Sequence, residues 1–208
     1  MRLFVLSVLI CIACSCKSYS AESTKILVFG DSLSAAYNIS PEKGWVTLLE
    51  NELIAEQTDV VFTNASISGE TTSGGLVRFA DQINKTQPDI LILELGANDG
   101  LRGSSLNTML KNLQTMIEIG QQNNVIVLLA GMHIPPNYGR TYTQKFDQIY
   151  IDLAKIDQVT LIPFLLEGVA TKPEFIQRDG IHPNEKAQPI ISSLVKRYLG
   201  PLLRIAAE

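Results

Sequence analysis

Cysteine is scarce in this sequence and is confined to the N-terminus. The three cysteines are Cys11, Cys14 and Cys16, and none follows them in the remainder of the 208 residues. A chain cleaved after Ser20, as the N-terminal pattern predicts, would contain no cysteine at all. Such a chain could form neither a disulfide bond nor a metal site with thiolate ligands.

Clusters of basic residues are absent as well. The net charge at pH 7 is −4, the pI is about 5.3, and lysine and arginine do not gather anywhere along the chain. Nucleic acids and anionic membrane surfaces attract proteins through concentrated positive charge, so we expect neither as the main partner. The sequence also lacks internal repeats, low-complexity tracts, linkers and glycine-rich phosphate-binding fingerprints.

The N-terminal apolar run is too short to cross a bilayer. Arg2 precedes the run from Leu3 to Ala13, and the segment 18–20 (Ser-Tyr-Ser) offers small residues for cleavage before Ala21. This order of a positive residue, an apolar stretch and a cleavage site predicts an export signal over residues 1–20.

A cysteine within such a signal could instead accept a lipid, as in bacterial lipoproteins. Cys14 fits this role poorly because Cys11 occupies the position where leucine is usual, whereas the surroundings of Cys16 are permissive. Two locations therefore stay open, a soluble exported protein and a membrane-anchored lipoprotein.

The remaining chain, residues 21–208, is long enough for one α/β domain with a substantial core, since 46% of all residues are hydrophobic. Short apolar runs typical of buried strands alternate with stretches whose apolar residues recur at helical spacing. The expected strands are 26–29, 60–62, 90–95, 125–130 and 159–162, and the expected helices include 45–54, 106–119 (closed by Gly120), 146–153 and 190–195. This alternation predicts a five-stranded parallel sheet between layers of helices.

The first expected strand ends in Gly30-Asp31-Ser32, and Ser32 is our candidate nucleophile. The residues before it are typical of a buried parallel strand, and the small residues predict a tight turn into a helix. Ligands of open α/β sheets bind at the carboxyl ends of the strands, where the Ser32 N–H could also donate to an anion. From this stretch alone, Ser32 could equally well cap the next helix.

Two later strands also end in glycine and small polar residues. After the second strand, Gly69 could make a positive-φ turn, let its N–H approach a ligand closely, or do both. After the third strand, Asn98 could cap a helix or point a side-chain donor into the same crevice. Glu94, a carboxyl inside that otherwise apolar strand, must be paired or hydrogen-bonded if it is buried, and we expect it to have a structural role.

Two histidines compete for the role of general base. Gly180 favours a turn and Pro183 keeps His182 out of helical geometry, so Asp179 and His182 can face each other across a tight bend. A carboxylate that accepts from an imidazole fixes its tautomer and stabilises the imidazolium. His133, in an apolar loop after the fourth strand, has no carboxylate at close spacing, so we favour His182.

Together these residues could carry out acyl transfer. Ser32 would be the nucleophile, His182 its base and Asp179 the group that orients the base. The N–H groups of Ser32 and Gly69 and the side chain of Asn98 could hold the oxyanion. The order serine, aspartate, histidine differs from those of chymotrypsin and subtilisin, and the Gly-x-Ser-x-Gly elbow is absent because a serine replaces its second glycine.

Four segments, in this order, resemble the four sequence blocks of the GDSL, or SGNH, hydrolases. They are 30–34 (Gly-Asp-Ser-Leu-Ser), 64–71 (Asn-Ala-Ser-Ile-Ser-Gly-Glu-Thr), 96–103 (Gly-Ala-Asn-Asp-Gly-Leu-Arg-Gly) and 179–184 (Asp-Gly-Ile-His-Pro-Asn). The resemblance extends over about residues 24–202. One departure is Ala97, where close relatives carry a second glycine, and it matters only if that backbone needs a positive φ.

The resemblance implies a flavodoxin-like, three-layer α/β/α fold, no metal, no cofactor and an exported, periplasmic location. It also implies a serine esterase acting on acyl esters and thioesters, such as lysophospholipids, acyl-CoA and aryl or alkyl esters. The segment near 71–77 and the loop at Ile134-Pro135 would accommodate the acyl chain. We accordingly expect a small-molecule or lipid acyl ester as substrate, and no stable protein partner.

Two other functions stay open. A carbohydrate O-acetylesterase would use similar catalytic residues but would need a more polar cleft than Ile134, Pro135 and Pro136 suggest. A non-catalytic flavodoxin-like binding module is the third possibility, and the absence of a phosphate-binding fingerprint argues against it. Chain-length preference among esters separates the first two, and failure of Ser32 to become acylated would favour the third.

Overall fold

A computed structural model describes residues 23–206 of the chain. The predicted export signal and its three cysteines lie outside the described residues. The strands are β1 (Thr24–Gly30), β2 (Val60–Asn64), β3 (Ile90–Glu94), β4 (Ile126–Ala130) and β5 (Val159–Ile162). They form one sheet in the order β2-β1-β3-β4-β5, and every neighbouring pair is parallel. The predicted five-stranded parallel sheet is therefore confirmed.

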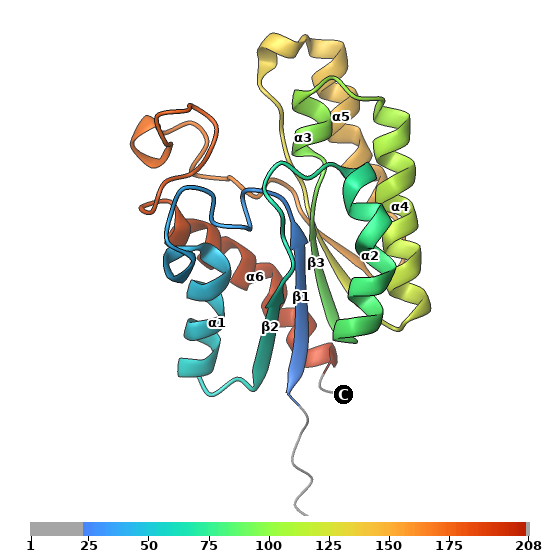
Figure 1. Ribbon diagram of the computed structural model, residues 1–208, viewed down its shortest axis with the longest axis vertical. Coiled ribbons are helices and arrows are strands. Elements are labelled where there is room, and N and C mark those ends of the chain that lie inside the picture. The colour runs from blue at the N-terminus through green and yellow to red at the C-terminus, as the bar shows by residue number, and fades with distance from the viewer. Residues whose placement is uncertain (1–22, 207–208) are drawn as a thin grey trace, which may run out of the picture.

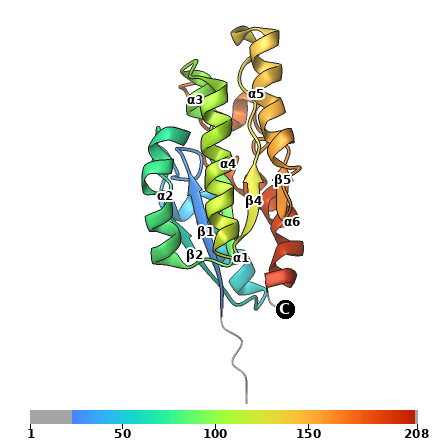
Figure 2. The ribbon, with the colours of Figure 1, turned by 90° about the vertical axis from the view of Figure 1, so that its right-hand side faces the viewer.

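Helices cover both faces of this sheet. They are α1 (Trp45–Ala55), α2 (Thr72–Thr86), α3 (Ala97–Leu101), α4 (Leu106–Gln122), α5 (Arg140–Leu153) and α6 (Gln188–Ala206). Figure 1 shows α1 and α6 on one face, and Figure 2 shows α2, α4 and α5 side by side on the other. The arrangement is the three-layer α/β/α sandwich expected from the sequence. Within residues 23–206, no helix has both the length and the apolar character needed to cross a membrane.

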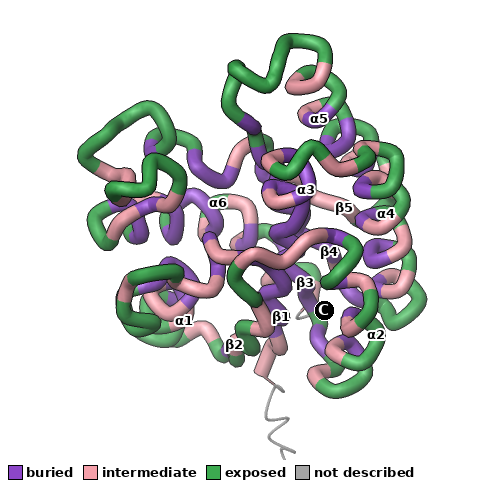
Figure 3. The backbone as a smooth tube through the Cα atoms, turned by 45° about the horizontal axis from the view of Figure 1, so that its top comes forward, coloured by how far each residue is buried: buried purple, intermediate pink, exposed green. Residues whose placement is uncertain are grey.

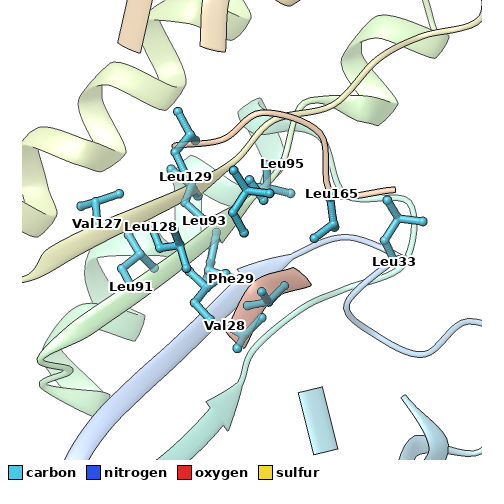
Figure 4. Packing of buried hydrophobic residues seen from close by; sticks show 14 of the residues in the cluster. Val28, Phe29, Leu33, Leu91, Leu93, Leu95, Val127, Leu128, Leu129 and Leu165 are labelled. Carbon is cyan, nitrogen blue, oxygen red and sulfur yellow. The ribbon is translucent and has the colours of Figure 1, made fainter. Parts of the chain in front are cut away.

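The central strands are apolar along their whole length because helices bury them on both faces. All five residues of β3 are buried, and Figure 4 shows side chains of β1, β3 and β4 packed together, among them Val28, Leu91 and Leu128. In Figure 3 the middle of the sheet is largely purple, whereas the outer surfaces of the helices and loops are green. The buried side chains on the two faces of the sheet thus form one core, and this packing holds the ends of the strands in place.

Several helices differ from the sequence-based bounds. Gly120 does not end α4, which continues to Gln122. Helix α5 begins at Arg140, earlier than the predicted start at residue 146. Its first turn is mostly polar and exposed, so the spacing of apolar residues does not reveal it. Helix α6 continues through Pro201 to Ala206.

Helix α2 begins at Thr72 and carries two glycines, Gly74 and Gly75, in its first turn. The Thr71 side chain accepts from the Gly74 N–H, and the Thr72 N–H donates to Asp99 at 2.8 Å. Close packing explains the glycine at position 75, since a Cβ there would lie 2.7 Å from the Leu95 side chain and 3.1 Å from that of Phe29. The glycine therefore lets α2 approach the sheet closely.

The strand order also determines where a ligand can bind. Strand β1 lies between β2 and β3. The connection from β1 to β2, through α1, covers one face of the sheet, and the connection from β2 to β3, through α2, covers the other. The strand order therefore reverses between β1 and β3, and such a reversal opens a crevice at the carboxyl ends of these two strands. Ser32 follows β1 and Asn98 follows β3, so the topology brings both residues to this crevice.

Candidate functional site

Ser32 lies in a tight turn directly after β1. Its Oγ is 2.9 Å from His182 Nε2 and 3.5 Å from Asp31 Oδ1. Gly30 allows the turn to lie against β3, because a Cβ at this position would be 2.5 Å from Glu94 Oε2. Ser32 itself is partly exposed and lines a cavity.

His182 is oriented by Asp179 across the predicted bend. His182 Nδ1 lies 2.7 Å from Asp179 Oδ2, and Gly180 adopts a φ of 76°, which makes the bend possible. The other carboxylate oxygen, Oδ1, accepts the backbone N–H groups of Ile181 at 2.9 Å and of His182 at 3.0 Å. The structure thus brings the Asp179–His182 pair, which sequence spacing predicted, next to Ser32, which lies 150 residues from His182 in the chain.

The protonation states of this trio follow from its contacts. Partial burial raises the pKa of Asp179, but the two backbone N–H groups and the His182 ring outweigh it and lower the pKa to about 2. An ionised Asp179 can only accept, so the proton of a neutral His182 ring resides on Nδ1. Nε2 is then the acceptor that faces the Ser32 hydroxyl.

The three candidate oxyanion donors surround the end of β1. Asn98 is in the first turn of α3, and its Nδ2 donates to Asp31 Oδ2 at 2.9 Å, which leaves one amide hydrogen for a ligand. Among residues 23–206, the backbone N–H groups of Ser32 and Gly69 have no hydrogen-bond partner. Gly69 has a φ of 80°, and its carbonyl accepts from Arg102 at 2.9 Å. Asn98 lines the cavity, whereas Gly69 lies outside the cavity wall.

Two carboxyl groups lie behind the nucleophile. Burial raises the pKa of Asp31 to about 6, although the Leu33 N–H, the Asn98 amide and the His182 ring act against this. Glu94 is fully buried, and burial together with the nearby Asp31 charge raises its pKa well above the ordinary range. Its Oε2 accepts from the Asp31 N–H at 3.1 Å and from Ser34 Oγ at 2.8 Å. Glu94 is therefore hydrogen-bonded, as predicted for a buried carboxyl.

A cavity of about 500 Å³ opens beside Ser32 and is predominantly apolar. Its walls come from the segments that follow β1, β3, β4 and β5, including helix α3. Ile134 and Pro135, which the family resemblance assigns to the acyl chain, are among the residues that line it. The segment 71–77 is not among the residues that line this cavity: residues from Thr72 onward belong to α2, and Thr72 is buried against Asp99. That this segment accommodates the acyl chain stays a prediction.

Sequence reasoning missed most of the apolar lining. Leu101 lies on α3, Met132 follows β4, and Phe164, Leu166 and Ile176 follow β5, so the three groups meet only in the folded chain. The signal that could have found some of them is the same one that identified Ile134, namely apolar residues in loops that follow strands.

His133, the rival base, also lines the cavity and has a carboxylate partner after all. Its Nδ1 lies 2.8 Å from Asp147 Oδ1, on α5, and its ring centroid lies 4.4 Å from that of Phe164. No carboxylate is close to His133 in sequence, as expected, but the position of α5 brings Asp147, fourteen residues away, within hydrogen-bond distance. The histidine within hydrogen-bond distance of Ser32 is nevertheless His182.

Ala97, the departure from the family pattern, is accommodated without strain. It is the first residue of α3 and is not among the residues with positive φ, whereas Gly96 before it has a φ of 118°. Among residues 23–206, no group of three or more His, Cys, Asp or Glu side chains is arranged so that it could hold a metal ion.

The chain resembles esterases in sequence. Residues 28–189 match the GDSL-like Lipase/Acylhydrolase family. The chain is 42% identical over 198 residues to an arylesterase of Vibrio mimicus, a match that covers 95% of this chain and 97% of that protein. It is 41% identical over 184 residues to the thioesterase 1/protease 1/lysophospholipase L1 of Escherichia coli strain K12, covering 88% and 87%.

Solved structures show the same fold. The crystal structure of TesA superimposes with a TM-score of 0.84 at 41% identity and covers 86% of this chain and 99% of that one. A structure of the psychrotrophic esterase EstA from Pseudoalteromonas sp., inhibited by monoethylphosphonate, gives a TM-score of 0.82 at 38% identity and covers 88% and 100%.

Proposed function

This chain belongs to the GDSL-like lipase/acylhydrolase family, and we propose that it hydrolyses acyl esters and thioesters through an acyl-enzyme formed on Ser32. Membership of the family makes it an esterase. The observation that supports these residues in their roles is the continuous hydrogen-bonded series from Ser32 Oγ to His182 at 2.9 Å and on to Asp179 at 2.7 Å.

Acylation begins when Ser32 Oγ attacks the carbonyl carbon of the ester. His182 Nε2 takes the hydroxyl proton as the new C–O bond forms, and the ionised Asp179 stabilises the imidazolium. The negative charge moves to the carbonyl oxygen, which accepts from the N–H groups of Ser32 and Gly69 and from the Asn98 amide. Fixed donors aimed at a developing oxyanion are each worth about 3–4 kcal/mol.

The tetrahedral intermediate then collapses and releases the alcohol or thiol. The leaving atom receives the proton that His182 took from Ser32, and the acyl group stays on the serine oxygen. Water repeats the sequence in the second half of the reaction: His182 takes a water proton, hydroxide attacks the acyl carbon, and Ser32 Oγ leaves and is reprotonated. The carboxylic acid is the second product.

The cavity supports a medium or long acyl group as the part of the substrate that is recognised. Ile134 and Pro135 lie in its wall, with buried apolar side chains such as Met132 around them. An acyl chain that leaves water for such a surface gains about 0.8 kcal/mol for each buried CH₂ group. The leaving group is less constrained, which agrees with the range of names among the relatives, from arylesterase to thioesterase and lysophospholipase.

We also propose that residues 1–20 are an export signal and that the mature enzyme acts outside the cytoplasm, in the periplasm. The support is the sequence pattern of Arg2, the apolar run and the small residues before Ala21. Intact mass of the protein from a periplasmic fraction tests this, since cleavage after Ser20 gives a chain starting at Ala21. A mass that includes a diacylglyceryl group on Cys16 would instead establish the lipid-anchored form.

The enzymatic proposal is tested by intact mass after incubation with a fluorophosphonate, for the wild type, Ser32→Ala and His182→Ala. We expect one adduct on the wild type, none on Ser32→Ala and a strongly slowed reaction of His182→Ala. A folded wild type that acquires no adduct would overturn the mechanism and favour a binding role. A panel of nitrophenyl esters then tests the substrate class: a preference for acetyl esters and acetylated sugars over longer chains would favour a carbohydrate O-acetylesterase.

A further inference from the structure

The segment that carries His182 has little regular structure to hold it. Residues 163–187 contain neither an α-helix nor a strand, only the short 3-10 helix Pro173–Phe175 and a single bridge between Ile176 and Pro183. The Asp179 side chain remains 34% exposed and that of His182 19% exposed. The imidazole therefore needs further contacts if it is to keep its direction while it exchanges a proton with Ser32.

Tyr37 supplies such a contact. Its ring centroid lies 4.4 Å from that of His182, and the two planes are inclined by 37°. Tyr37 belongs to the loop after β1, the same loop that carries Ser32, and it is 40% exposed. The ring is thus not part of the core, and it lies against the imidazole.

The backbone around Tyr37 is held in an unusual conformation. Ala36 has a φ of 55° and Asn38 a φ of 57°, so both neighbours lie in the left-handed region. Asparagine tolerates this region, but alanine does so only at a cost in free energy, and such strain persists where surrounding contacts impose it. One of these contacts is the Tyr37 N–H, which donates to the Ser32 carbonyl at 3.2 Å.

Gln177 connects the Tyr37 loop to the His182 segment. Its Nε2 donates to the Tyr37 carbonyl and to the Pro183 carbonyl, both at 2.9 Å. Its backbone N–H donates to the His182 carbonyl at 2.8 Å. Hydrogen bonds from Gln177 to backbone carbonyls therefore connect the two loops, in addition to the contact between the Tyr37 and His182 rings.

From these contacts we propose that Tyr37 is a positioning residue, whose ring keeps the His182 imidazole in line between Asp179 and Ser32; the inference rests on the proposed role of His182 as the base. Without the ring, the imidazole is free to turn about its Cβ–Cγ bond, and either Nδ1 or Nε2 loses its partner. The aromatic face also lies against the ring that becomes cationic in the transition state, which favours the imidazolium.

The test compares Tyr37→Leu with Tyr37→Phe in steady-state hydrolysis of one nitrophenyl ester. Leucine removes the aromatic face, and we expect kcat to fall by about 10- to 100-fold with KM changed by less than about 3-fold, since small misalignments of reacting groups cost rates of this size. Phenylalanine keeps the face and should restore kcat to within about 3-fold of the wild type. Tyr198→Leu, on α6 and not among the residues that line the cavity, is the control and should keep the wild-type kcat.

A spectroscopic measurement distinguishes positioning from a general loss of stability. The low-field proton resonance of the His182 Nδ1–H, bound to Asp179, should be sharp in the wild type and Tyr37→Phe and broadened or lost in Tyr37→Leu. An unchanged kcat in Tyr37→Leu, or a loss confined to KM, would overturn the inference. Equal losses in the leucine and phenylalanine variants would do so too, because they would assign the effect to the hydroxyl group.

Failure of this inference is separable from failure of the proposed mechanism. If the wild type forms the Ser32 adduct and depends on His182, while Tyr37→Leu behaves as the wild type, only the role of Tyr37 is wrong. If the folded wild type forms no adduct, the mechanism itself is wrong, whatever the tyrosine variants do.

Discussion

The Asn98 side-chain amide donates to Asp31 Oδ2 at 2.9 Å, so the carboxyl next to the proposed nucleophile holds the proposed oxyanion donor. The same carboxyl accepts the Leu33 N–H at 3.0 Å, on the far side of Ser32. Asp31 thereby connects the turn that carries Ser32 with the helix that carries Asn98. The nucleophile and the oxyanion donor are positioned by one buried side chain.

Removal of the Asn98 amide should lower the rate of the chemical step. For Asn98→Ala we expect kcat to fall by about 100- to 1,000-fold with little change in KM, because the amide binds the oxyanion and not the ground state. Asn123→Ala, at the exposed end of α4, is the matched control. A fall in kcat/KM caused by KM alone would contradict the assignment of Asn98 to the oxyanion hole.

Asp179→Asn should leave the fold intact but disable the base. The neutral amide can favour the wrong tautomer of His182, and kcat should fall by about 10,000-fold. The pKa of Asp179 in the folded protein, about 2, lies below its ordinary value of 3.8. The wild type therefore gains stability from the ionised carboxylate above pH 3.8 and loses it as the pH falls towards 2. Denaturant titrations between pH 2 and pH 5 should show this loss in the wild type and not in Asp179→Asn.

The buried carboxyls Asp31 and Glu94 should affect stability with the opposite sign. The pKa of Asp31 is raised from 3.8 to about 6, so between these values the folded state keeps a proton that the unfolded state releases. Stability should fall by about 3 kcal/mol as the pH rises through this window, at about 1.4 kcal/mol for each pKa unit.

Glu94 adds to this fall from pH 4.5 upward, since its pKa is also raised. Glu94→Gln keeps an oxygen to accept from the Asp31 N–H and from Ser34, and it removes the ionisation. We expect the free energy of unfolding, measured with urea at pH 5 and pH 8, to fall less in Glu94→Gln than in the wild type. Glu118→Gln, exposed on α4, is the control and should fall like the wild type.

Gly30 should tolerate no side chain. An added Cβ would lie 2.5 Å from Glu94 Oε2 and 2.9 Å from Ser34 Oγ, so Gly30→Ala should cost about 1–3 kcal/mol of unfolding free energy and lower activity through the displaced Ser32 turn. Gly200→Ala in α6 meets no atom within 4 Å and should be neutral or stabilising. Equal thermal stabilities for the two variants would contradict the packing argument.

Filling the cavity should change the choice of acyl chain. Ile134 is buried in its wall, and Ile134→Phe would occupy part of the 500 Å³ volume. We expect kcat/KM to fall for long-chain nitrophenyl esters and to stay near the wild-type value for acetyl and butyryl esters. Ile151→Phe, which is 49% exposed on α5, is the control and should keep the wild-type preference. An unchanged ratio in Ile134→Phe would mean that the chain binds elsewhere.

Much of the fold was readable from the sequence because its signals are local. Apolar runs such as 90–95 and helical spacing such as 106–119 depend on residues only a few positions apart, and both elements are present. The ends of helices were less predictable. Helix α4 continues past Gly120 because the glycine faces packed side chains of the sheet, a condition that the local sequence does not contain.

For the site, the sequence by itself determined which residues could take part: Ser32, Gly69, Asn98, Asp179 and His182 follow from turn chemistry and residue type at strand ends. Only the tertiary structure decided which of them meet. It placed His182 within hydrogen-bond distance of Ser32 and His133 within hydrogen-bond distance of Asp147. It also placed the Tyr37 ring against the His182 imidazole and formed the cavity from segments that follow four different strands. The physical reason is that these contacts join residues far apart in the chain, and their distances depend on strand order and on how the loops pack.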